Sequence, residues 1–155
     1  MRILGIDPGT GILGFGVIEV IKKKAKLVDA GVIRTPVKED DAVRLATIYD
    51  ELTDIITSTK PTIMVVEKLF FAQNITTAMT VSQARGVVLL CGQQAGLELH
   101  EYTPLQIKMA LTSYGRADKK QIQEMVRVIL ELKEIPKPDD CADALAAALC
   151  HAQSV

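Results

Sequence analysis

The sequence predicts a single α/β domain, residues 1–155, in which a five-stranded mixed sheet carries helices on both faces. Three short strands joined by tight turns come first along the chain. Helical segments then alternate with two further strands. No linker, repeat or low-complexity stretch divides the chain. A strand meander followed by alternating helices and strands is typical of a mixed sheet that is covered on both sides.

The N-terminal strands are predicted to form an antiparallel meander. They are expected at residues 2–7, 13–20 and 26–34. A glycine turn at residues 9–11 and a charged turn of lysines at residues 22–24 separate them, and such tight turns join antiparallel neighbours. Gly14 and Gly16 alternate with larger residues, which indicates that another backbone or a ligand closely approaches one face of the second strand.

The period of the apolar residues changes at Asp41. Apolar residues then recur at helical spacing as far as Ile56, and the helix is expected to end at residues 59–61. The nearly all-apolar segment 62–67 is typical of a strand covered on both faces. Beyond it we expect a helix at 75–95, a strand at 97–102, and helices at 104–111, 119–132 and 139–151. Crossovers that return to the first strand would place it beside segment 62–67.

Composition excludes several classes of protein. The 48% hydrophobic and 24% charged content is that of a soluble globule. Because no stretch is long enough to span a membrane and the N-terminus lacks a signal-peptide pattern, a cytoplasmic location is expected. Cys91, Cys141 and Cys150 form no CxxC pair and are predicted to be buried, reduced thiols. His100 and His151 form no zinc-binding pattern.

Acidic residues end two of the predicted buried strands. Asp7 closes the first strand and Glu67 closes the fourth. A buried carboxylate is costly unless it is paired, hydrogen-bonded or bound to a cation. Because these two strands are expected to be neighbours, we expect both carboxylates at one edge of the sheet.

A third acidic element begins the last predicted helix. Asp140 and Asp143 are three residues apart and share a side of the helix, and Asp139 and Asp143 could also share a face. For one aspartate, helix capping by Asp139 or compensation of the helix dipole is an ordinary structural explanation. Converging carboxylates, however, repel one another unless cations neutralise them, and oxygen ligands favour magnesium or manganese. Two such ions can activate water and stabilise the leaving oxygen of a phosphodiester, so we predict a metal-dependent active site.

The net charge of −1 does not by itself indicate a nucleic-acid-binding protein. Charge is unevenly distributed, however, with five basic and two acidic residues between Pro104 and Arg127. A local basic face can bind phosphates, although a solvated helix face has the same composition. The five basic residues are Lys108, Arg116, Lys119, Lys120 and Arg127.

Four short sequence motifs follow one another along the chain in an order typical of a known family. They are Gly5-Ile-Asp-Pro-Gly-Thr-Gly11, Val65-Val-Glu-Lys-Leu-Phe-Phe71, Gln83-Ala-Arg-Gly86 and Asp139-Asp-Cys-Ala-Asp-Ala-Leu145. The chain thereby resembles the RuvC family of Holliday-junction resolvases over essentially its whole length. The resemblance implies a ribonuclease-H-like fold and a magnesium-dependent homodimer. It also implies symmetric paired nicks across four-way DNA junctions in recombination and repair, with a branch-migration complex of the RuvA and RuvB type as partner.

The resemblance also implies the catalytic residues. By motif match, the carboxylates that catalyse the reaction and bind metal are Asp7, Glu67, Asp140 and Asp143, with two magnesium ions expected and manganese as a substitute. Asp140 is preferred to Asp139 because the family motif has two residues between its last two acids. Some members carry histidine at the position that matches Asp140.

DNA-binding residues follow from the same resemblance. The family aromatic residue thought to act on junction bases matches Phe70, with Phe71 beside it as the alternative. An aromatic side chain between a strand end and a helix start can stack on an unpaired base, although core packing is the usual role of phenylalanine. Family lysines implicated in DNA contact match Lys108 and Lys119, and Lys120 is a possible substitute for the latter. All three lysines lie within the basic stretch identified from charge.

Other protein classes share part of the pattern. An actin-like ATPase would have the first motif but would need two such domains, which 155 residues cannot supply. A YqgF-type nuclease, linked to RNA processing, would share mainly the first motif, and residues 138–143 favour the resolvase. A non-catalytic DNA-structure binder would lack some of the acids, and none is missing.

Paired cuts by a chain with one carboxylate cluster require two copies related by a two-fold axis. We expect the helix at 75–95 to form the interface between them. Burial against the sheet is the rival explanation for its apolar positions. The small and apolar residues concerned are Val81, Ala84, Gly86, Val88 and Leu89.

Overall fold

The structure, a computed structural model, describes residues 1–68 and 75–155 and confirms the five-stranded mixed sheet. The strands are β1 (Arg2–Asp7), β2 (Ile12–Ile21), β3 (Lys24–Arg34), β4 (Ile63–Glu67) and β5 (Glu98–Tyr102). The helices are α1 (Asp41–Thr59), α2 (Ile75–Gln94), α3 (Pro104–Thr112), α4 (Lys119–Ile129) and α5 (Asp139–Ser154). Each predicted element is therefore present within a few residues of its expected bounds.

The strands lie in the order β3-β2-β1-β4-β5. β1, β2 and β3 form the predicted antiparallel meander, and β4 runs parallel to β1 and β5. Ile6 pairs with Val66, so the residues that follow them, Asp7 and Glu67, end neighbouring strands at the same edge. The prediction that the first and fourth strands are adjacent is confirmed.

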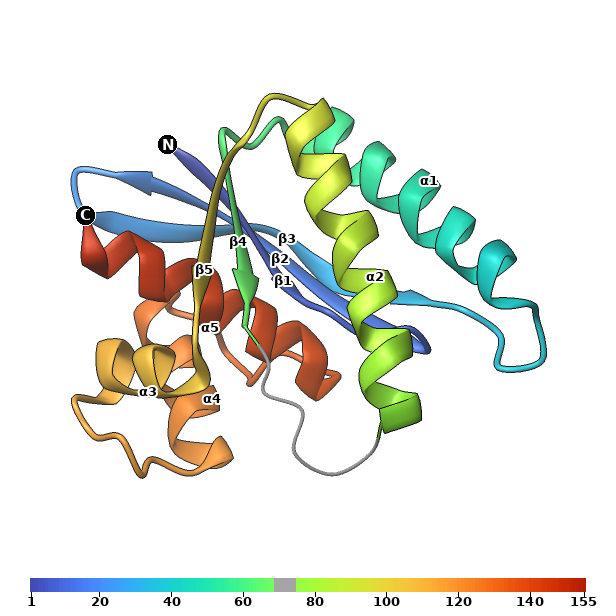
Figure 1. Cartoon of the computed structure of the whole chain (residues 1–155). Coiled ribbons are helices and arrows are strands. Elements are labelled where there is room, and N and C mark those ends of the chain that lie inside the picture. Colours follow the sequence, from blue (N-terminus) through green and yellow to red (C-terminus); the bar gives the residue numbers. More distant parts are fainter. Residues whose placement is uncertain (69–74) are drawn as a thin grey trace.

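Helices cover both faces of the sheet (Figure 1). α1 and α2 pack on one face, over a core that includes Leu4, Ile6 and Met64. α3, α4 and α5 pack on the other face, over a core that includes Ile3 and Val65. Successive strand residues point to opposite faces, which explains why the apolar residues of β4, which precede Glu67, supply both cores.

α5 lies unusually close to the sheet because glycines remove the side chains between them. A Cβ atom added to Gly5 would overlap the carbonyl oxygen of Ala144, and one added to Gly14 would overlap the carbonyl oxygen of Asp140. At Gly16 an added Cβ would press on the side chain of Leu145. The predicted close approach at Gly14 and Gly16 is confirmed, and the approaching group is the backbone and one side chain of α5.

Several element bounds differ from the predicted ones for local reasons. α4 ends at Ile129 rather than at residue 132, because Glu131 adopts a positive φ of 55°. β2 and β3 are longer than predicted because only Lys22 and Lys23, both with positive φ, form the turn between them. α5 continues past His151 to Ser154.

Two predictions made from the composition concern the state of the cysteines and the length of the apolar segments. The three cysteines are free and buried, as predicted. Within residues 1–68 and 75–155, no helix is long and apolar enough to cross a membrane.

α2 contradicts part of the predicted interface. Ala84 and Val88 are completely buried in the core beneath the helix, so their apolar character is explained by packing on the sheet. Gly86 is exposed, with open space where its Cβ would lie. The exposed apolar side chains of the helix are instead Ile75, Met79 and Leu90, which are 81%, 61% and 48% exposed.

Candidate active site

Three structural elements bring the predicted carboxylates to one edge of the sheet. Asp7 and Glu67 end the neighbouring strands β1 and β4. Asp140 and Asp143 lie in the first turns of α5, and Asp7 pairs across the sheet with Gly14, against which the backbone of Asp140 packs. The glycine contact therefore places the start of α5 directly beside the end of β1.

The carboxylates act on one another electrostatically. Burial, followed by the charges of Glu67, Asp143 and Asp140, raises the pKa of Asp7 to about 9. Asp7 and Glu67 share a hydrogen bond, and burial together with the charge of Asp143 raises the pKa of Glu67. Burial also raises the pKa of Asp143, although Lys119 opposes the shift. Carboxyl groups perturbed by both burial and like charge are typical of a functional site.

The donor set suits hard divalent cations. All four acids offer carboxylate oxygens, the ligands preferred by magnesium and manganese. A cation would relieve the repulsion that helps to raise the pKa values of Asp7, Glu67 and Asp143. In the described part of the chain, no group of three or more acidic, histidine or cysteine side chains is arranged so that it could hold a metal ion. The four acids therefore suit such ions by their chemistry, but their side chains do not form a ligand set as they stand.

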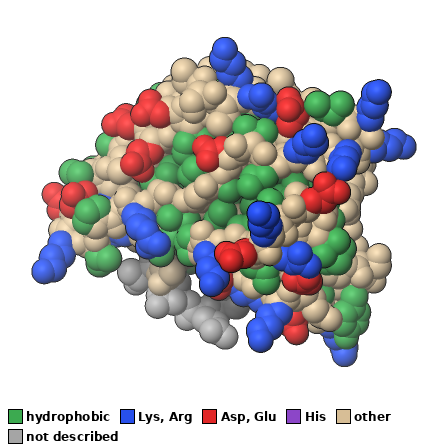
Figure 2. Space-filling model, turned by 180° about the vertical axis from the view of Figure 1, so that it is seen from behind, with side chains coloured by type: hydrophobic (Ala, Val, Ile, Leu, Met, Phe, Trp, Pro, Cys, Tyr) green, Lys and Arg blue, Asp and Glu red, His purple; other side chains and the backbone are tan. Residues whose placement is uncertain are grey.

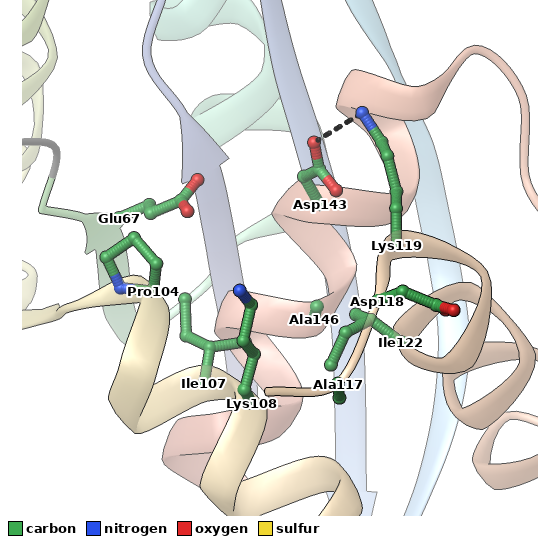
Figure 3. A pocket seen from close by; sticks show the side chains of 10 residues that line it. All are labelled: Glu67, Pro104, Ile107, Lys108, Ala117, Asp118, Lys119, Ile122, Asp143 and Ala146. Carbon is green, nitrogen blue, oxygen red and sulfur yellow. Dashed lines mark ion pairs between the residues drawn. The ribbon is translucent and has the colours of Figure 1, made fainter. Parts of the chain in front are cut away.

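A cavity of about 270 Å³ opens beside the carboxylates. In it the carboxylates of Glu67 and Asp143 point into one space, toward which the amine of Lys108 also points (Figure 3). The positive charges of Lys119 and Lys108 partly counter the raised pKa of Glu67. The lining residues are Glu67, Pro104, Ile107, Lys108, Ala117, Asp118, Lys119, Ile122, Asp143 and Ala146.

Lys119 contacts the acids of α5 directly. Its Nζ lies 3.7 Å from Oδ2 of Asp143 (Figure 3). The same Nζ lies 3.2 Å from Oδ2 of Asp139. Asp139 also accepts a hydrogen bond from Nε2 of Gln123 at 3.1 Å. The N-cap of α5 is Pro138, with no side-chain cap, so the capping explanation for Asp139 is wrong. These ion pairs depend on how α4 packs on α5, and the sequence carried no signal for them.

The remaining predicted DNA-binding residues occupy different positions. Lys120 lines a separate hollow between α3 and α4, with Thr112, Gln121 and Met125 among its neighbours. Phe70, and Phe71 beside it, lie outside the described residues. Seen from behind, Lys and Arg side chains are intermixed with Asp and Glu around apolar areas, without one uniform basic patch (Figure 2).

Comparisons with known proteins point to one family. The family model for RuvC, crossover junction endodeoxyribonuclease, matches residues 3–151. A crossover junction endodeoxyribonuclease RuvC from Heliobacterium modesticaldum is 56% identical over 155 residues, covering 100% of this chain and 96% of that relative. The corresponding protein of Rubrobacter xylanophilus is 53% identical over 152 residues, covering 98% of this chain and 85% of the relative.

Solved structures agree as well. RuvC of Thermus thermophilus in complex with a Holliday junction substrate superposes with a TM-score of 0.94 at 38% identity, covering 99% of this chain and 94% of that one. The yeast mitochondrial Holliday junction resolvase, at 13% identity and a TM-score of 0.70, covers 97% of this chain and 77% of that one and supports the fold alone. The ribonuclease-H-like fold is thus confirmed. With its family model matched from residue 3 to residue 151, the chain belongs to the RuvC family of crossover junction endodeoxyribonucleases.

Proposed function

We propose that this protein is a structure-selective endonuclease that resolves four-way DNA junctions by symmetric paired nicks, in homologous recombination and DNA repair. The observation that carries the proposal is the convergence of Asp7, Glu67 and Asp143 beside a cavity that Lys108 and Lys119 also line. Family membership and the junction-bound structure of the Thermus relative support the choice of substrate. The whole chain, residues 1–155, acts as one nuclease domain.

The carboxylates supply the metal ligands in this proposal. Asp7, Glu67, Asp140 and Asp143 would hold two magnesium ions, for which manganese substitutes. When bound, such ions activate a water and stabilise the leaving oxygen of the cut phosphodiester. The proton shared by Asp7 and Glu67 must leave before both can act as anionic ligands. Lys119 compensates the charge of Asp143 until then.

Basic and aromatic residues bind the substrate. Lys108 reaches the cavity from α3 and is placed to neutralise a phosphate that enters it. Lys119 stands on the opposite wall and exchanges its contact with Asp143 for the phosphate. Lys120 contributes a contact outside the cavity, and Phe70 acts on the bases at the junction.

The assembly follows from the reaction. Two copies form a homodimer so that opposed strands are cut symmetrically. A branch-migration complex of the RuvA and RuvB type delivers the junction, and the enzyme works in the cytoplasm.

Cleavage of a synthetic four-way junction tests the proposal. Linear duplex, single-stranded DNA and RNA of the same sequence serve as controls, each with magnesium and with a chelator. We expect symmetric nicks in the junction alone, and only with magnesium. Equal cutting of linear duplex, or preferential cutting of RNA, would overturn the proposal and favour a YqgF-type nuclease. Hydrolysis of ATP without DNA cleavage would favour an actin-like nucleotide-binding module.

A further inference from the structure

We propose that the loop between α3 and α4, residues 113–118, is a second DNA-binding element. Through Tyr114 and Arg116 it binds a junction strand outside the cavity in which the strand is cut. The inference rests on the proposed function, because it names further contacts for the same substrate. The DNA-binding residues assigned by motif match include neither of these two residues, although Arg116 belongs to the basic stretch between Pro104 and Arg127.

The loop is held in one conformation at both ends. Ser113 takes a positive φ of 58° as the C-cap of α3, and its N–H donates to the carbonyl of Met109 at 3.0 Å. The backbone N–H of Tyr114 donates to the Thr112 hydroxyl oxygen at 3.1 Å. At the other end, Asp118 caps α4, and its side chain accepts from the N–H of Gln121 at 2.8 Å.

The middle of the loop is fixed as well. The N–H of Ala117 donates to the carbonyl of Tyr114 at 3.2 Å, and Ala117 is only 2% exposed. Gly115 lies against α3, since a Cβ added there would be 2.8 Å from Cδ1 of Leu105. A loop ordered in this way presents its outward side chains with little conformational entropy left to lose on binding.

The outward side chains are an aromatic residue and an unpaired cation. Tyr114 is 52% exposed, and Arg116 is exposed and makes no ion pair with any residue that the structure describes. A burial role, the usual explanation for an aromatic residue, is therefore not available to Tyr114. An exposed ring beside a guanidinium is the combination that binds single-stranded nucleic acid, by stacking on a base and pairing with a phosphate.

The position of the loop matches that role. In Figure 1 the loop runs along the lower side of the molecule, the side at which β4 ends and α5 begins. Its last residues, Ala117 and Asp118, line the carboxylate cavity, so the loop leads outward from the cut site. Lys120 follows on α4, beside a hollow that Ser113 also lines. A strand leaving the cavity would thus meet Lys119, Arg116 and Tyr114 in an ordered series.

Charge decides between DNA and a protein as the occupant. The exposed apolar residues Leu105 and Met109 of α3 lie near the loop and could by themselves suit a protein surface. Residues 104–127, however, carry five basic and two acidic side chains. Of the two acids, Asp118 is engaged as a helix cap and Glu124 is paired with Arg127. The unpaired charge around the loop is therefore positive, which favours a polyanion.

Equilibrium binding of a four-way junction, measured in a chelator so that no cleavage occurs, tests the proposal. Tyr114→Ala should weaken binding roughly 5- to 150-fold, the range for loss of one stacked base. Tyr114→Phe keeps the ring and should bind nearly as well as the wild type. Arg116→Gln should reduce the slope of log affinity against log salt by roughly 0.7 to 0.9. Lys26→Gln, the matched control on exposed β3, removes the same charge and should change neither quantity.

Photocrosslinking locates the contact. Junctions that carry 5-iododeoxyuridine at single positions on either side of the cut should crosslink to Tyr114, as identified by mass spectrometry, and not to Tyr114→Ala. Crosslinks confined to other residues, or unchanged affinity and salt slope in both loop variants, would overturn the inference while leaving wild-type junction cleavage intact. The inference would also be overturned if the loop variants bound DNA normally but sedimented differently from the wild type without DNA. That result would assign the loop to a contact between protein chains. If wild-type protein fails to bind or cut junctions, the proposed function itself fails.

Discussion

Single residues in the carboxylate cluster are proposed to carry the chemistry, and their replacement should separate cleavage from binding. Asp7→Asn, Glu67→Gln and Asp143→Asn should each lower the rate of junction cleavage roughly 100-fold or more, because each removes a charge proposed to ligate metal. Junction affinity should persist, since the lysines proposed to contact phosphate are unchanged. Cleavage assays beside gel-shift binding measure both. Near-normal cleavage by Asp7→Asn with magnesium present would contradict the assignment.

The pKa of Asp7 also makes a prediction about stability without metal. Burial first, and then the neighbouring charges, raise this pKa to about 9, whereas an unfolded aspartate ionises near pH 4. Between those values the folded protein holds a proton that the unfolded chain has released, so stability should fall as the pH rises. Asp7→Asn mimics the protonated acid and should remove most of this fall. Urea unfolding in a chelator at about pH 6 and about pH 9 measures the difference. If the unfolding free energy fell by the same amount between these pH values in the wild type and in Asp7→Asn, the raised pKa of Asp7 would be refuted.

Lys119 and Lys120 should differ in effect although they are adjacent in sequence. Lys119 contacts Asp143, so Lys119→Ala should lower both cleavage and junction affinity. Lys120 lies outside the carboxylate cavity, so Lys120→Ala should act through affinity and reduce the salt slope by roughly 0.9. Titrations at several salt concentrations, with single-turnover rates at saturating enzyme, resolve the two effects. If the double variant keeps the wild-type affinity and salt slope, this stretch is only a solvated helix face.

At the scale of elements, the seating of α5 on the sheet should be intolerant of a single methyl group. Gly14→Ala places a Cβ on the carbonyl oxygen of Asp140, and the resulting overlap should cost about 2–3 kcal/mol of unfolding free energy. Gly86→Ala on α2 is the matched control, because nothing lies within 4 Å of the added Cβ. That change should stabilise the helix by about 0.5–1 kcal/mol. Chemical denaturation of both variants decides the point, and equal effects would contradict it.

The far end of α5 should make the fold sensitive to acid. Nδ1 of His151 lies 2.8 Å from the hydroxyl of Tyr102, and its ring centroid lies 4.2 Å from that of His100. Burial, followed by the charge of His100, lowers the pKa of His151, although Glu98 opposes the shift. The neutral ring therefore stabilises the fold above the ordinary histidine pKa of about 6.5. This contribution is lost as the pH falls through the lower, folded value.

His151→Gln cannot be protonated and should lose less stability than the wild type between about pH 7 and about pH 5. Thermal or urea unfolding at both pH values checks this. Identical losses in the two proteins would assign the acid sensitivity to other groups.

For the whole molecule, the paired reaction requires two chains on each junction. Met79 and Leu90 are among the exposed apolar residues of α2, so Met79→Glu combined with Leu90→Glu should reduce the mass of the DNA-free protein from that of the proposed dimer to that of a monomer. Val128→Glu on α4, where the residue is 50% exposed, serves as the control. Sedimentation with junction DNA should show two wild-type chains bound. One chain that cuts both strands at equal rates would overturn the two-fold mechanism.

The sequence predicted features that depend on neighbouring residues in the chain better than features that depend on how distant elements pack. Strand-end acids such as Asp7 and Glu67 marked the site because a strand that ends in a buried charge needs a reason in any fold. Gly14 and Gly16 marked the close approach of α5 for the same kind of reason. The ion pairs of Lys119 with Asp139 and Asp143 gave no comparable signal, because they arise only when α4 packs on α5. Ala84 and Val88 were wrongly predicted to lie in the dimer interface. An apolar helix face has the same sequence pattern whether it packs on a sheet or on a second chain.

The direct backbone contact between α5 and the sheet has a consequence for hydrogen exchange. Ala144, Ala147 and Ala148 of α5 are fully buried, and Gly5 and Gly14 leave no side-chain layer between the helix and the strands that could loosen separately. Local opening of the helix would therefore have to break the core itself. Amides in the middle of α5 should exchange only through global unfolding, with the free energy of the whole domain. Amide hydrogen exchange in the middle of α5 would thus report how firmly the helix that carries Asp140 and Asp143 is held on the sheet.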